Sequence, residues 1–263
     1  MPAVMDSDFR LNYEERGSGP PLLLVHGFPL DHTMWRFQLE ALSDRWRVIA
    51  PDLRGFGQSS VAPGTVTMAQ FADDLAGLLS VLKIDRPVVF CGLSMGGYVA
   101  WQFALKHRSK LAKLILCDTR AIGDSAEAAA GRLKTAEKVL AEGARVVADA
   151  MLPKLFAAST ATRSPALVAA TKEVILKTSP AGIAAALRGM AERPDVTSRL
   201  SELDLPVLVI CGQHDAISPP AEMQGIAAKL PQGKYVEIAE AGHMAPLEQP
   251  AAVNRAIAEF LGP

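Results

Sequence analysis

The sequence has few cysteines, no surplus of charge of either sign and no long apolar run. Its 263 residues include three cysteines, and 27 Lys and Arg residues are balanced by 28 Asp and Glu residues, for a formal net charge of −1. A nucleic-acid-binding domain usually carries a basic surplus, so the charge balance argues against a nucleic-acid partner. No apolar stretch has the length that a membrane-spanning helix requires, so we expect no membrane partner.

The cysteines Cys91, Cys117 and Cys211 indicate neither a disulfide framework nor a metal site. Their number is odd, and their spacing matches no metal-ligand motif. Each stands at the C-terminal end of an apolar run, where a thiol packs as a small hydrophobic group. We therefore predict three buried free thiols and no metal.

The first ten residues also lack the basic segment and the apolar segment of a secretory signal. We therefore expect a cytoplasmic protein. The length fits one large α/β domain, or a domain with an insertion, and the 49% hydrophobic content is enough for a sizeable core.

Strand-like apolar runs alternate with helical segments along most of the chain, which is typical of a mostly parallel sheet covered on both faces. Between residues 119 and 203 no strand-like run occurs, and Ala, Lys and Glu recur at helical spacing. We predict a helical cap over 119–203, inserted into a core formed by 1–118 and 204–263. The alternative is that these helices pack on the flank of the sheet. The expected helices are 126–142, 144–152, 165–177 and 180–192.

Ser94 lies in the segment Gly92-Leu93-Ser94-Met95-Gly96, directly after the apolar run 87–90. That run predicts a buried strand, and residues 98–105 predict a helix. A Gly-x-Ser-x-Gly motif on a strand-to-helix turn is typical of a nucleophile elbow, where glycine avoids crowding on either side of the serine. The motif alone is a weak pattern, and a chance match is the alternative. In this context we predict that Ser94 is a nucleophile.

A serine hydroxyl is a poor nucleophile near neutral pH, so it needs a base and a group that orients the base. Histidine is the expected base because its ordinary pKa is about 6.5. His243 follows a predicted strand over 234–238, and loops after strand C-termini hold the catalytic side chains of open α/β sheets. We choose His243 over the remaining histidines: His26, His32, His107 and His214.

Two carboxylates, Asp118 and Asp215, directly follow predicted strands and precede His243 in the chain. Asp215 has the better context, because Gly212 makes a turn before it and Pro219-Pro220 begins a helix after it. We predict Asp215 as the orienting acid. For Asp118 the alternative role is a carboxylate that caps a loop.

An acyl-transfer intermediate carries an oxyanion that needs two preorganised N–H donors. Met95 supplies one, since its amide stands at the start of the helix after the nucleophile. The segment His26-Gly27-Phe28-Pro29 supplies the other, and Phe28 is the candidate because proline has no N–H. We predict an oxyanion hole formed by Phe28 and Met95.

Taken together, these motifs resemble the α/β-hydrolase superfamily over nearly the whole chain. The matching segments are 26–29, 52–59, 91–97, 212–215 and 242–244. The resemblance implies an α/β-hydrolase fold with an eight-stranded, mostly parallel sheet and a helical cap inserted after strand six. It also implies a catalytic triad of Ser94, Asp215 and His243 that works without a cofactor. Haloalkane dehalogenases and epoxide hydrolases resemble this fold but carry aspartate at the elbow.

Within the superfamily, segments 91–97 and 116–119 look like those of 3-oxoadipate enol-lactonases, and the His-Gly-aromatic loop looks like that of bacterial carboxylesterases and arylesterases. We predict a serine esterase that cleaves a small ester or lactone substrate through an acyl-enzyme. The alternatives are an enol-lactone hydrolase, a carbon–carbon bond hydrolase, perhydrolysis as a side reaction, and a triad-bearing small-molecule receptor. Arg120 is a candidate for binding a substrate carboxylate, and a surface ion pair is its alternative role. Candidate pocket residues are Phe28, Trp35, Met95, Met151, Leu152, Phe156 and Met190.

Overall fold

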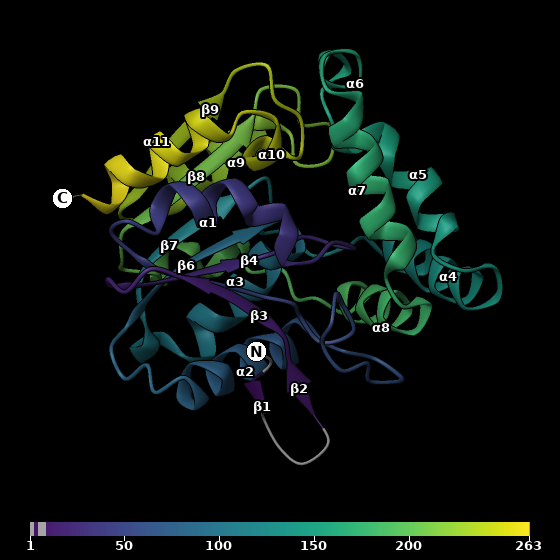
Figure 1. The fold of residues 1–263 in the computed structure, drawn as a ribbon, viewed down its shortest axis with the longest axis horizontal. Helices are drawn as coiled ribbons and strands as arrows, with labels where there is room; N and C mark the ends of the chain where they lie inside the picture. Colours follow the sequence, from purple (N-terminus) through teal and green to yellow (C-terminus); the bar gives the residue numbers. More distant parts are fainter. Residues whose placement is uncertain (1–2, 5–8, 263) are drawn as a thin grey trace.

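A seven-stranded sheet forms the centre of the computed structural model, which describes residues 3–4 and 9–262 (Figure 1). The strand order is β3-β5-β4-β6-β7-β8-β9, and only the β3–β5 pair is antiparallel. The predicted mostly parallel sheet is therefore confirmed. Its strands are β3 (Tyr13–Arg16), β4 (Pro21–Val25), β5 (Arg47–Pro51), β6 (Val88–Leu93), β7 (Leu111–Cys117), β8 (Val207–Gly212) and β9 (Gly233–Ile238).

Over the described ranges the main sheet has seven strands rather than the eight that the resemblance implied, because the N-terminal segment divides. The expected strand over 9–14 is split into β2 (Arg10–Leu11), which pairs with β1 (Ala3–Val4) in a separate ribbon, and β3. The division falls at Asn12, whose N–H donates to Ser59 Oγ at 2.9 Å and whose Nδ2 donates to Asp52 Oδ2 at 2.8 Å. These bonds turn the chain toward the loop after β5. The ten N-terminal residues, where we predicted no targeting signal, include the undescribed positions 1–2 and 5–8.

Helices cover both faces of the sheet, because successive strand side chains point to opposite faces. One face packs against α2 (Met68–Val81), α3 (Met95–Lys106) and α9 (Pro220–Lys229). The other packs against α1 (Arg36–Leu42), α10 (Ala245–Glu248) and α11 (Pro250–Leu261). In Figure 1, α1 and α11 lie above the sheet and α2 and α3 below it. The three cysteines are buried and free, as predicted.

Between β7 and β8 every residue is described, and none of them belongs to a strand. This segment forms α4 (Ala126–Glu142), α5 (Arg145–Leu155), α6 (Ala158–Arg163), α7 (Pro165–Lys177) and α8 (Pro180–Ala191). These helices gather at the right of the sheet in Figure 1. The short helix α6 was not expected from the sequence, because its Ser and Thr residues have weak helix propensity. Short 3₁₀ helices are η1 (His32–Trp35), η2 (Arg108–Lys110) and η3 (Thr197–Glu202).

Helix α8 attaches the 119–203 segment to the rest of the protein through a close backbone contact. A Cβ atom on Gly182 would collide with the carbonyl oxygen of Gly55, and one on Gly189 would collide with that of Val66. The Val66 N–H also donates to the Ala185 carbonyl at 3.1 Å. The two glycines, seven residues apart on one helix face, thus let α8 lie directly on the loop after β5.

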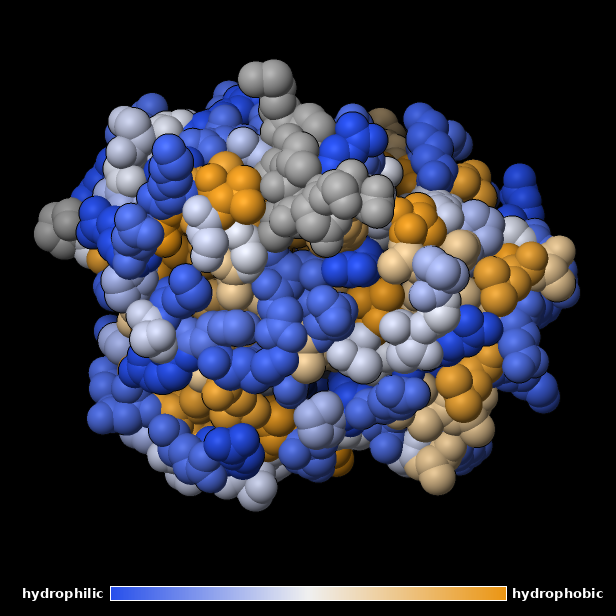
Figure 2. All heavy atoms as spheres, turned by 90° about the horizontal axis from the view of Figure 1, so that it is seen from below, coloured by the Kyte–Doolittle hydropathy of each residue, from blue (hydrophilic) through white to orange (hydrophobic). Residues whose placement is uncertain are grey.

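The surface carries no extended apolar face in the view of Figure 2, where polar residues surround smaller groups of apolar ones. The large exposed hydrophobic residues are Val61, Val81, Ile122, Leu133 and Leu140. Among the described helices, none has both the length and the apolar character needed to cross a bilayer.

Candidate active site

Ser94 occupies a strained turn between β6 and α3. Its φ of 52° and ψ of −111° lie in a region that residues other than glycine rarely adopt. A Cβ atom on Gly92 would collide with the carbonyl oxygen of Gly96, and one on Gly96 would collide with that of Val25. The strand, turn and helix predicted around Ser94 are therefore present, together with the crowding that requires glycine. The Ser94 side chain is half-buried.

His243 and Asp215 are joined by a buried hydrogen bond. His243 Nδ1 lies 2.8 Å from Asp215 Oδ2, and the two side chains are 2% and 0% exposed. Asp215 Oδ1 accepts the N–H groups of Ile217 at 2.8 Å and Ser218 at 3.0 Å. Because Nδ1 donates to the carboxylate, Nε2 is the ring nitrogen available to act as a base. The structure thus brings together two of the three residues predicted for the triad.

The loop that carries His243 is bonded to the junction between α5 and α6. Glu248 accepts the N–H groups of Gly242 and Ala157, each at 2.8 Å. The Met244 N–H donates to the Leu155 carbonyl at 3.1 Å. Sequence reasoning missed Glu248, since an acidic residue five positions after a histidine belongs to no motif. Its role depends on a partner 91 residues away in the chain.

The loop after β4 packs directly on the elbow. A Cβ atom on Gly27 would lie 2.7 Å from Leu93 Cδ2 and 3.4 Å from Ser94 Cβ. The ring of His26 holds this loop, since its Nε2 accepts the Leu53 N–H at 2.9 Å and its Nδ1 donates to the Gly27 carbonyl at 3.0 Å. Burial lowers the pKa of His26, which agrees with a neutral ring. His26 therefore shapes the loop.

Phe28 and Met95, the predicted oxyanion-hole residues, stand in the two segments that Gly27 and Gly96 bring into contact. Gly96 packs against the backbone of Val25 and His26, and Phe28 stands two residues after His26. Met95 is the first residue of α3. The first N–H groups of a helix have no partner within the helix, so the Met95 amide is available to an anion.

Asp118, the competing acid, is buried at the end of β7. Its Oδ1 accepts the Gly212 N–H at 2.7 Å, which agrees with the alternative role of a loop-capping carboxylate. Burial, followed by the charge of Asp215, raises the pKa of Asp118 well above its ordinary value. The carboxylate bonded to His243 is that of Asp215.

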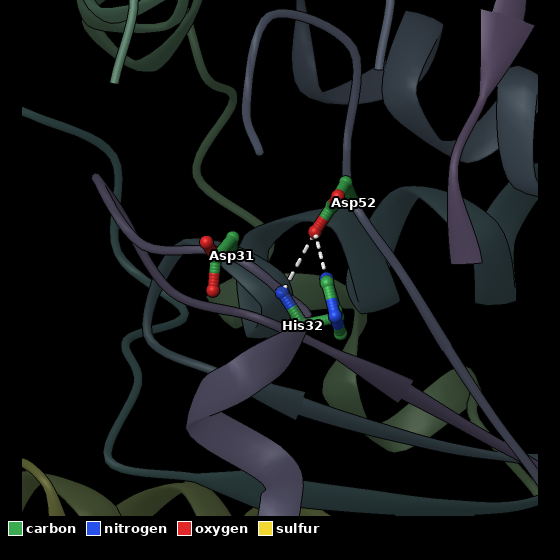
Figure 3. Close-up of side chains that lie close together, drawn as sticks. All are labelled: Asp31, His32 and Asp52. Atoms are coloured by element: carbon green, nitrogen blue, oxygen red, sulfur yellow. Dashed lines mark hydrogen bonds and ion pairs between the residues drawn. The ribbon is translucent and has the colours of Figure 1, made fainter. Parts of the chain in front are cut away.

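Two groups of side chains have donor atoms close enough together to be considered for a metal ion. The first group is Asp118, Cys211 and Asp215, and the second is Asp31, His32 and Asp52. Within each group, the donor atoms lie within 4.8 Å of one another. Figure 3 shows that Asp52 bonds both the N–H and the ring of His32, while the Asp31 carboxylate has no such bond to either residue. Asp31 instead accepts the Thr33 N–H at 3.0 Å and caps η1. These hydrogen bonds explain why Asp31, His32 and Asp52 lie close together.

Arg120 is paired with Glu222 of α9. Its Nε lies 2.9 Å and 3.0 Å from the two carboxylate oxygens of Glu222, and its Nη2 lies 2.8 Å from Oε2. The bond to Glu222 raises the pKa of Arg120. This geometry favours the alternative role of a surface ion pair.

A cavity of about 410 Å³ lies between three of the 119–203 helices and two residues of the core. Phe28 and Ile217 contribute to it from the core, and α4, α5 and α8 supply the rest of its wall. Ile217 also binds the candidate acid Asp215 through its N–H, whereas Ser94, Asp215 and His243 themselves do not line the cavity. Of the predicted pocket residues, Phe28 and Met151 line it.

Comparisons with known proteins agree with this geometry. Residues 20–250 match the family model for the alpha/beta hydrolase fold. 3-Oxoadipate enol-lactonase 2 of Acinetobacter baylyi is 30% identical, over 95% of this chain and 92% of its own length. A malate-bound thermophilic esterase of Thermogutta terrifontis superposes with a TM-score of 0.95 at 52% identity, covering 96% of this chain and 93% of that one.

A second solved structure, the enol-lactonase of Burkholderia xenovorans LB400, superposes with a TM-score of 0.90 at 32% identity, and 97% of each chain is covered. These names agree with the sequence-based prediction of a carboxylic ester hydrolase. The family match spans most of the chain, and the mostly parallel sheet and the strand–turn–helix around Ser94 are those that the resemblance implied. The chain belongs to the α/β-hydrolase family.

Proposed function

We propose that this protein is a serine hydrolase that cleaves small carboxylic esters through an acyl-enzyme, with Ser94, His243 and Asp215 as its catalytic triad. The observation that carries the proposal is the buried His243–Asp215 hydrogen bond of 2.8 Å. It occurs in a parallel sheet whose strand β6 leads into the strained Ser94 turn. Carboxyl ends of parallel strands share one edge of a sheet, which puts all three loops on the same side.

The reaction follows from the chemistry of these groups. His243 Nε2 takes the proton of Ser94 Oγ as that oxygen attacks the ester carbonyl, and the N–H groups of Phe28 and Met95 bind the resulting oxyanion. Asp215 stabilises the imidazolium. His243 then gives its proton to the departing alkoxide, and afterwards takes one from the water that hydrolyses the acyl-enzyme. It returns this proton to Ser94 Oγ as the acid product leaves. No step needs a cofactor.

In this proposal residues 119–203 form a cap over the catalytic edge, and the 410 Å³ cavity beneath it holds one part of the substrate. Such a volume suits a small substrate, since ligand pockets span about 300–1,000 Å³. The names of the relatives support an ester or a lactone as the substrate class.

Lactone hydrolysis is the second candidate, because two of the relatives are enol-lactonases at 30% and 32% identity. A lactone is an internal ester, so the same residues act in the same order. The difference is that the leaving alcohol remains attached to the acyl group. A substrate panel separates the two candidates.

The test is steady-state hydrolysis of p-nitrophenyl esters of increasing acyl length and of a panel of lactones. We expect Ser94→Ala to lower kcat/KM by at least about a thousandfold, with the thermal unfolding temperature retained. Ser198→Ala, at an exposed serine on η3, is the matched control and should keep wild-type rates. Ester turnover that survives Ser94→Ala would contradict the proposal, and a preference for lactones would favour the second candidate.

A further inference from the structure

Asp118 is a buried acid that the proposed mechanism does not use. It directly follows β7 with a φ of 48°, a left-handed conformation uncommon for residues other than glycine, and its residue exposure is 0%. One oxygen, Oδ1, accepts the Gly212 N–H at 2.7 Å. The other, Oδ2, is buried without a hydrogen-bond partner among the described residues. A buried oxygen without a partner is costly, so Oδ2 calls for an explanation.

The carboxylate of Asp215 lies close to that of Asp118 and has room for one more donor. Ligand atoms of Asp118, Asp215 and Cys211 all lie within 4.8 Å of one another. Asp215 accepts three N–H groups, from Ile217, Ser218 and His243. A carboxylate offers about four acceptor positions, so one position remains.

The other titratable groups around Asp118 do not supply a donor or a positive charge. The thiol of Cys211 is directed at the carbonyl oxygens of Ser218, at 3.4 Å, and Gly212, at 3.5 Å. The thiol of Cys117 lies 3.9 Å from that of Cys91. The electrostatic influences on Asp118 come from Asp215 and Cys117, both acidic groups.

Two neighbouring buried carboxyl groups do not both remain ionised, because the second charge has neither water nor a cation to stabilise it. Three N–H groups stabilise a negative charge on Asp215, whereas one N–H group stabilises a charge on Asp118. The raised pKa of Asp118, caused first by burial and then by the charge of Asp215, agrees with this assignment.

We propose that Asp118 is a neutral acid whose Oδ2–H donates a hydrogen bond to the Asp215 carboxylate, which makes it a positioning residue for the catalytic pair. This bond fills the last acceptor position of Asp215 and leaves one negative charge on the two acids. It also withdraws negative charge from the Asp215 carboxylate that binds His243. The catalytic consequence rests on the proposed function, whereas the protonation state does not.

The protonation state is tested by infrared spectroscopy of the wild-type protein between pH 7 and 8. We expect the carbonyl stretch of a protonated carboxylic acid, shifted by ¹³C-aspartate labelling and absent from Asp118→Asn. A spectrum without this band, or a band that survives Asp118→Asn, would overturn the inference. The measurement needs no substrate, so it stands even if ester hydrolysis is not the activity.

The positioning role is tested by the pH dependence of kcat/KM. The asparagine amide of Asp118→Asn can accept the Gly212 N–H and donate to Asp215, so the acid limb should stay at its wild-type pH. Asp118→Ala removes the donor and makes Asp215 a stronger partner for the protonated ring, so the acid limb should move up by about 0.5–1 pH unit.

If Asp118 is ionised instead, a different pH profile is expected for Asp118→Asn. Asp118→Asn would then remove a negative charge near His243 and move the acid limb to lower pH, which would contradict the inference. If Asp118 has only a structural role, Asp118→Ala lowers the activity without moving the acid limb of the pH profile. That result would also contradict the inference. If Asp118→Ala does not fold, the infrared band and the Asp118→Asn profile still decide.

Discussion

Asp52 is the acid whose removal should destabilise this fold most clearly, and Asp52→Asn tests that expectation. The side chain is fully buried just after β5. It accepts the N–H of His32 at 2.8 Å and His32 Nδ1 at 2.7 Å (Figure 3). It also accepts Asn12 Nδ2 at 2.8 Å and the Gln58 N–H at 2.9 Å. One carboxylate thus joins the β2–β3 break, η1 and the loop before α2.

The magnitude follows from this count of donors. An amide has one acceptor oxygen, and its NH₂ group would face two of the four donors. Hydrogen bonds to a charged group are worth about 1.5–3 kcal/mol each, and a buried donor left without a partner costs about 1–3 kcal/mol. Such terms are not additive, so we expect Asp52→Asn to lower the free energy of unfolding by about 3–5 kcal/mol.

The effect should depend on pH in a defined direction. Burial by itself would raise the pKa of Asp52, but the hydrogen bonds from His32 and Gln58 outweigh it and lower the pKa. The contribution of Asp52 is therefore present above its unfolded pKa of about 3.9 and is lost as the pH falls through the lower folded value. The bond to Asp52 raises the pKa of His32. The contribution of protonated His32 to stability is present below its unfolded pKa of about 6.5 and is lost as the pH rises through its raised folded pKa.

Urea unfolding followed by circular dichroism at about pH 5.5, between these two ordinary pKa values, gives the largest difference between wild type and Asp52→Asn. The difference should shrink toward more acidic and more alkaline pH. Asp44→Asn is the matched control, because Asp44 is exposed, and it should change stability by less than about 0.5 kcal/mol. A loss below about 1 kcal/mol for Asp52→Asn, or a difference that is largest at alkaline pH, would refute this reasoning.

Two further predictions concern the elbow and Arg120. Gly92→Ala should destabilise the protein by more than about 2 kcal/mol in urea unfolding, because its Cβ would collide with the Gly96 carbonyl; Gly131→Ala, at an open helical position on α4, should be neutral or stabilising. An equal cost for the two variants would exclude the collision as the cause. Arg120→Ala should change kcat/KM equally for a carboxylated and a neutral ester, since its guanidinium is paired with Glu222. A selective loss on the carboxylated ester would restore its candidate role in substrate binding.

The features predicted correctly are those whose cause lies within a few residues of the chain. Gly92 and Gly96 flank Ser94 because a tight turn crowds neighbouring backbone atoms. Apolar β-branched runs predicted the buried strands, and the long segment without such runs predicted the helices of 119–203. The expected helices over 126–142 and 165–177 have the observed boundaries.

The remaining features depend on partners that are distant in the chain. The local context of Asp215 favoured it as the partner of His243, but the partner of Asp118, the Gly212 N–H, lies 94 residues away and is visible only in the folded sheet. Asn12 interrupts the expected first strand because Asp52 and Ser59 bind it. Elements, turns and the chemical character of the site thus follow from local sterics and periodicity. The shared burial of Asp118 and Asp215, which raises the pKa of Asp118, arises only when folding brings distant segments together and excludes water.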